Sequence, residues 1–135
     1  MRHRCLHPNR LLVLSLGIVL FIVITAGIGS AADYRPLIGL WQRVDGTYVI
    51  DVRRVAPDGR IDARYLNPRE INASQAEAST MKGYLKIFLE LRDAGYPGST
   101  YTLLYDPEQD VLIGTYYQAV QRQNFDVVFV RANRQ

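Results

Sequence analysis

Residues 33–135 contain no cysteine and no histidine, because Cys5, His3 and His7 all lie in the first 32 residues. Their absence excludes disulfides, thiolate and Ser-His nucleophiles, and the usual transition-metal ligand sets from this part of the chain. We therefore expect no metal and no cofactor.

Catalysis would have to rest on carboxylate, tyrosine, lysine or arginine side chains. General acid-base chemistry on carboxylates needs a pair that converges in one pocket. The spacing of Asp51, Asp62 and Glu90 shows no such pair. The sequence therefore predicts that the protein is not an enzyme.

Residues 33–135 also lack an excess of positive charge. Three of the 16 basic residues, Arg2, Arg4 and Arg10, precede the first acidic residue, so 13 basic residues face 13 acidic ones in the rest. Nucleic-acid binding requires a concentrated positive surface. Nucleic acid is therefore not an expected partner.

The first 32 residues are typical of an export signal. A basic start is followed by the uninterrupted apolar run Leu11 to Ile28, which predicts a hydrophobic helix, and then by small residues that end at Ala32. We expect 1–32 to be a signal peptide cleaved after Ala32, and 33–135 to be the exported domain.

An uncleaved membrane anchor is the alternative for this segment. The 18 residues from Leu11 to Ile28 would span about 27 Å as a helix, close to the thickness of a bilayer core. The basic end stays in the cytoplasm in both cases. The domain is thus expected to be extracytoplasmic, either periplasmic or secreted, with membrane contact only through an uncleaved anchor.

Short runs with two-residue alternation dominate from Ile38 onward. The clearest is the run Leu85 to Leu91. Leu85, Ile87, Leu89 and Leu91 share one face, with Lys86, Glu90 and Arg92 opposite. The predicted strands are 38–43, 46–55, 60–67, 71–79, 83–92, 99–106, 110–119 and 124–131. The segment Ile71 to Met81 would also suit a short helix.

The links between these strands are short and rich in Gly, Pro and Asp, as in Asp45-Gly46 and Pro57-Asp58-Gly59. Short links force consecutive strands to be antiparallel. The expected fold is all-β, a small antiparallel up-and-down meander of about eight strands that closes into a barrel. A sandwich is the alternative.

The start of the domain, Gly39-Leu40-Trp41, resembles the G-x-W opening of the calycin superfamily, which includes lipocalins and avidins. The resemblance implies a calycin-like barrel in which Trp41 closes one end and packs against Arg131 of the last strand. Gly39, Trp41 and Arg131 are then structural residues. Arg43 stands where an avidin has a small polar biotin contact, and no second tryptophan follows, so biotin is not expected.

Tyrosine is the abundant aromatic residue, and all nine tyrosines lie in 33–135. Strand alternation places five of them in the interior: Tyr48, Tyr65, Tyr101, Tyr105 and Tyr117. Phenol rings that line an interior offer apolar contact with a few polar tips. We predict that they bind a small apolar or aromatic ligand, as in a lipocalin. The alternative is that these rings fill a solid barrel.

A second function is a protein-interaction or inhibitor role, or a homo-oligomer. The loop 93–101 carries Tyr96 and Pro97 between glycines, which predicts a shaped surface for a partner. Apolar residues on the strand faces opposite the core would form an outer-wall interface if they are contiguous. They are Val49, Leu66, Leu104, Leu112, Tyr116, Val128 and Val130.

Overall fold

The structure is a computed structural model, and it describes residues 31–133. These residues form one nine-stranded sheet and a single turn of 3-10 helix, η1. The elements are η1 (Arg35–Leu37), β1 (Gly39–Arg43), β2 (Val49–Val55), β3 (Ile61–Asn67), β4 (Arg69–Ile71), β5 (Ala73–Met81), β6 (Tyr84–Asp93), β7 (Tyr96–Asp106), β8 (Val111–Gln118) and β9 (Gln123–Ala132).

All strand pairs are antiparallel, and the order in the sheet is β4-β3-β2-β1-β9-β8-β7-β6-β5. Consecutive strands are neighbours except β4 and β5, and the first strand pairs with the last. The predicted all-β up-and-down meander is therefore confirmed. The alternative of a short helix at Ile71 to Met81 is wrong, because this segment is extended, as the predicted strand required.

The predicted closed barrel of eight strands is not what the sheet forms. The segment expected as one strand over 71–79 is divided at Asn72 into β4 and β5, because Asn72 turns toward β6, its side-chain amide donating to the carbonyl of Arg92. β4 then pairs only with β3, and β5 only with β6.

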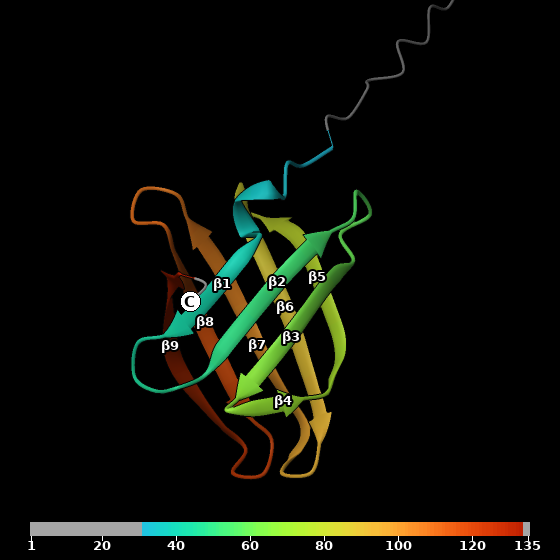
Figure 1. Cartoon of the computed structure of the whole chain (residues 1–135), viewed down its shortest axis with the longest axis vertical. Coiled ribbons are helices and arrows are strands. Elements are labelled where there is room, and N and C mark those ends of the chain that lie inside the picture. Colours follow the sequence, from blue (N-terminus) through green and yellow to red (C-terminus); the bar gives the residue numbers. More distant parts are fainter. Residues whose placement is uncertain (1–30, 134–135) are drawn as a thin grey trace, which may run out of the picture.

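The two edges of the sheet nevertheless meet at one point. Arg60 and Glu77 form an isolated antiparallel bridge, and the amide of Ala78 donates to the carbonyl of Gly59 at 2.6 Å. Figure 1 shows the result: the sheet curls so that β1 to β4 lie in front of β6 and β7. The edges touch without a continuous ladder. We call this contact the seam.

The core fills the inside of the curled sheet. The strand over Leu85 to Leu91 is confirmed, and Ile87, Leu89 and Leu91 are buried as the alternation predicts. The four largest fully buried side chains come from four different strands, β1, β3, β7 and β9: Trp41, Tyr65, Tyr101 and Phe129.

The prediction of which β8 side chains face the core is wrong by one residue. Leu112 and Tyr116 are buried in the core, whereas Tyr117 pairs with Thr100 and Asn124 on the outer face. Both faces of this strand carry apolar residues, so alternation alone could not choose between them. The observed register of β8 against β7 requires a residue without a side chain at position 114. A Cβ on Gly114 would lie 1.9 Å from the carbonyl oxygen of Thr102.

The expected hydrophobic helix of 1–32 lies outside the described residues, apart from Ala31 and Ala32. Within the part of the chain that the structure describes, no helix is long and apolar enough to cross a membrane.

Candidate functional site

One end of the curled sheet is closed by η1 and Trp41. The indole of Trp41 is fully buried and donates to the carbonyl of Leu37 at 2.8 Å. The guanidinium of Arg131 lies 4.1 Å from the centre of the indole ring, as predicted from the sequence. The same guanidinium donates to the carbonyls of Ile38 and Pro36, both at 2.9 Å, and thereby ties η1 to β9.

Two residues complete this closed end. Gly39 has φ of +142°, and a Cβ there would lie 2.7 Å from Nη1 of Arg131. Tyr105, which we expected among the ligand-binding tyrosines, donates to Asp110 at 3.0 Å, with its ring 6.1 Å from that of Trp41. The structure therefore separates Tyr105 from the other interior tyrosines.

The interior tyrosines meet in the half of the molecule away from η1. The hydroxyls of Tyr65 and Tyr101 lie 2.9 Å apart, and both side chains are fully buried. The ring of Tyr101 stacks on that of Tyr116, with 4.5 Å between the ring centres. Burial, reinforced by Tyr101, holds the pKa of Tyr65 well above its ordinary value. Burial raises the pKa of Tyr101 to about 12 against the opposing hydrogen bonds from Tyr65 and Arg43.

Beyond these rings, the sheet opens into a cavity of about 400 Å³. We call it the mouth. It lies at the end where the β1–β2, β6–β7 and β8–β9 turns gather, the lower end in Figure 1. Its walls are the aromatic rings of four residues, Tyr48, Tyr96, Tyr116 and Phe125, and its rim carries Gly95, Gln118 and Gln121. Of the lining residues within 31–133, Arg43 is the one that is charged.

The guanidinium of Arg43 is held among these rings. It lies 4.9 Å from the ring centre of Tyr48 and 5.8 Å from that of Tyr116. It donates to the carboxylate of Asp45 through Nε at 2.5 Å and Nη2 at 2.8 Å, and to the hydroxyl of Tyr101 through Nη1 at 3.5 Å. Burial lowers the pKa of Arg43, but the hydrogen bonds to Asp45 and Tyr101 outweigh it and raise that pKa overall.

The two residues expected at a partner surface separate in the structure. Tyr96 lines the mouth, where it accepts a hydrogen bond from Asn67 at 2.5 Å, whereas Pro97 is exposed. The wide loop predicted over 93–101 is instead a tight turn at Ala94-Gly95, because β6 and β7 pair as far as Asp93 and Tyr96. Tyr96 therefore lies in the wall of the mouth, apart from the exposed Pro97.

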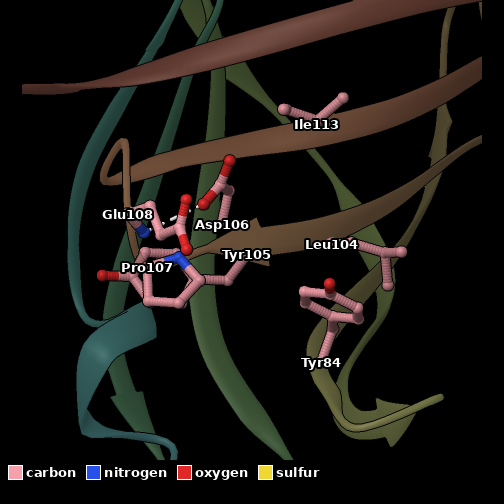
Figure 2. Close-up of a pocket in the computed structure, with 7 residues that line it drawn as sticks. All are labelled: Tyr84, Leu104, Tyr105, Asp106, Pro107, Glu108 and Ile113. Carbon is pink, nitrogen blue, oxygen red and sulfur yellow. Dashed lines mark hydrogen bonds between the residues drawn. The ribbon is translucent and has the colours of Figure 1, made fainter.

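A second hollow lies on the outer wall, near the closed end. Figure 2 shows Tyr84, Leu104 and Ile113 on one side of it and the β7–β8 turn with Pro107 and Glu108 on the other. Its volume is about 550 Å³. Tyr84 is 52% exposed and Ile113 41%, so apolar surface is open to solvent here. Of the outer-wall residues that we predicted, Leu104 lines this hollow, whereas Leu112 and Tyr116 are in the core.

Sequence reasoning missed several residues of the mouth. Tyr116 is predicted on the outer wall, because the wrong face of β8 is predicted to be the inner one. The sequence marks Arg43 only as a departure from the avidin pattern, although Arg43 stands on the same strand face as Trp41, two residues away. Phe125 shares the inner face of β9 with Val127 and Phe129, and this alternation could have identified it.

The described residues contain no group of three or more acidic, histidine or cysteine side chains that could hold a metal ion. No protein-family model, no curated protein and no solved structure matches this chain. The fold and the geometry of the mouth therefore carry the functional argument alone.

Proposed function

We propose that residues 33–135 form an exported binding module that holds a small apolar or aromatic ligand in the mouth. The observation that carries the proposal is the cavity of about 400 Å³, walled by three tyrosines and a phenylalanine. This volume lies within the usual range for small-molecule sites. Aromatic walls with polar tips favour a flat, largely apolar ligand.

The proposal has three further parts. Export is supported by the basic start, the apolar run and the small residues that end at Ala32. A calycin-like architecture is supported by the stacked Trp41 and Arg131 and by the pairing of the first strand with the last. The ligand is bound and not transformed, and binding needs no metal or cofactor.

Calorimetric titration with a neutral aromatic probe, benzamide, tests the proposal. Protein purified after expression of the full chain should bind benzamide, and Tyr48→Ser should weaken binding by about tenfold or more, because it removes one aromatic wall. Tyr84→Ser is the matched control, since Tyr84 is a half-exposed tyrosine on the outer wall. Absence of binding, or equal weakening by both substitutions, would contradict the proposal.

The outer hollow favours a second candidate function, contact with a protein partner. Exposed Tyr84 and Ile113 border it, and apolar hollows on an outer wall are typical of interaction sites. Ile113→Asp should then abolish a partner complex or a homo-oligomer in analytical ultracentrifugation and leave benzamide binding unchanged. A sedimentation profile that Ile113→Asp does not alter would count against this second function.

A further inference from the structure

Arg43 brings a charged group to the mouth, and its counter-anion Asp45 lies outside the lining, on the β1–β2 turn. Among the described residues that line the cavity, Arg43 carries the only formal charge, and the others are aromatic, amide or glycine residues. Its side chain is 11% exposed, so its charge is largely removed from water. A desolvated guanidinium favours a charge-assisted hydrogen bond to an anion over a bond to a neutral acceptor.

Arg43 has hydrogen-bonding capacity left. A guanidinium has five N–H donors, and the described contacts use three of them, two on Asp45 and one on Tyr101. The remaining N–H groups belong to Nη1 and Nη2. Two neighbouring donors of this kind match the two oxygens of a carboxylate.

The rings beside Arg43 define the rest of the ligand. Tyr48 and Tyr116 flank the guanidinium, and Phe125 lies against Tyr116 with 6.4 Å between the ring centres. A flat ring that enters this space contacts aromatic faces and brings its substituent toward Arg43.

We infer that the ligand class of the mouth is a small aromatic carboxylate, bound through Arg43, and that Asp45 sets its affinity. This inference rests on the proposed function, because it names the ligand of that same site. Asp45 is already the counter-anion of Arg43, and its side chain is 55% exposed on the β1–β2 turn. The bound carboxylate shares the guanidinium with Asp45, so the negative charge of Asp45 weakens its binding.

The test compares benzoate with benzamide by calorimetry, using protein purified after expression of the full chain. The two probes have the same ring and nearly the same shape, and only benzoate is charged at pH 7. We expect benzoate to bind about tenfold more tightly than benzamide. Arg43→Gln should remove this preference, because it removes the charge and keeps polar donors.

Asp45→Asn provides the second variant, and it acts in the opposite direction. It should strengthen benzoate binding about three- to fivefold, the equivalent of an exposed ion pair, and leave benzamide binding unchanged. Asp58→Asn is the matched control, since Asp58 also pairs with an arginine two residues away, Arg60, but on the β2–β3 turn. It should change neither affinity.

The outcomes separate the inference from the function on which it rests. Equal affinities for benzoate and benzamide would overturn the carboxylate inference and leave the aromatic site intact. Weaker or unchanged benzoate binding in Asp45→Asn would overturn the role of Asp45, even if Arg43→Gln failed to fold. If neither probe bound, the proposed function would fail together with the inference.

Discussion

At the scale of single residues, the hydroxyls of Tyr65 and Tyr101 are polar groups buried in an aromatic interior. Each buried hydroxyl needs a hydrogen-bond partner, because an unpaired one costs about 1 to 3 kcal/mol. Here the two hydroxyls satisfy each other, and Tyr101 also accepts from Arg43. The cluster thus connects the packed core to the charged residue of the mouth.

Removing one of these hydroxyls should destabilise the fold. Tyr101→Phe leaves the hydroxyl of Tyr65 without its partner, and we expect the free energy of unfolding to fall by about 1 to 2 kcal/mol. Urea unfolding followed by circular dichroism measures this change. Tyr84→Phe, at a half-exposed tyrosine on the outer wall, should alter it by less than about 0.5 kcal/mol. Equal effects would contradict the role given to the cluster.

The same residues predict a loss of stability at alkaline pH. The pKa of Tyr101 is raised from 10.0 to about 12, mainly by burial. The folded state keeps this proton where the unfolded state has lost it, so the contribution is complete below pH ~10 and falls by about 2 to 3 kcal/mol by pH ~12. Tyrosinate absorbance should show buried tyrosines that ionise only as the protein unfolds. Reversible ionisation of all tyrosines in the folded state would contradict this.

Arg131 is the residue on which the closed end depends. Arg131→Met keeps much of the apolar stem but loses the hydrogen bonds to Pro36, Ile38 and Asp110. We expect a loss of about 2 to 4 kcal/mol in unfolding free energy and a red shift of Trp41 fluorescence as water reaches the indole. Arg54→Met, at an exposed arginine on β2, should change neither. An unshifted spectrum in Arg131→Met would show that Arg131 does not shield Trp41.

At the scale of strands, the seam is the feature that sets the shape of the sheet. Gly59 lies there with φ of +89°, and a Cβ on it would approach the carbonyl oxygen of Ala78 to 2.2 Å. Gly83 has nearly the same conformation, φ of +85°, with open space around it. The two glycines therefore differ in the seam contact and not in backbone strain.

A comparison of substitutions at these two glycines therefore measures how much the seam contributes to the free energy of unfolding. Gly83→Ala should cost about 1 to 2 kcal/mol of unfolding free energy, the penalty for an L-residue with positive φ. Gly59→Ala should cost at least about 1 kcal/mol more, because the added methyl group forces β5 away from the β2–β3 turn. Thermal unfolding of both variants gives the comparison. Equal costs would mean that the edges do not meet in solution.

The strands themselves were predictable from two-residue alternation wherever one face is apolar and the other mostly polar, as in Leu85 to Leu91. β8 was not, since Leu112 and Tyr116 on one face compete with Val111 and Ile113 on the other. The division at Asn72 was not predictable either, because it depends on contacts with Arg92 and Asp93, about 20 residues away.

At the scale of the whole molecule, the two ends of the curled sheet differ in chemistry. Trp41, Arg131 and η1 close one end, while rings around Arg43 leave the other end open. Only the chemistry of the closed end could be predicted from the sequence, because the G-x-W resemblance indicates the contact between Trp41 and Arg131. The mouth required the long-range register that places Arg43 opposite Phe129 and Tyr101 opposite Tyr116.

The most direct measurement is a titration of isotope-labelled protein with benzoate, followed by nuclear magnetic resonance chemical shifts. The account predicts saturable shifts that concentrate at Arg43, Tyr48, Tyr96 and Tyr116, with the resonances of Tyr84 and Ile113 unmoved. Shifts centred on Tyr84 and Ile113, or no saturable shift at any of these residues, would contradict it.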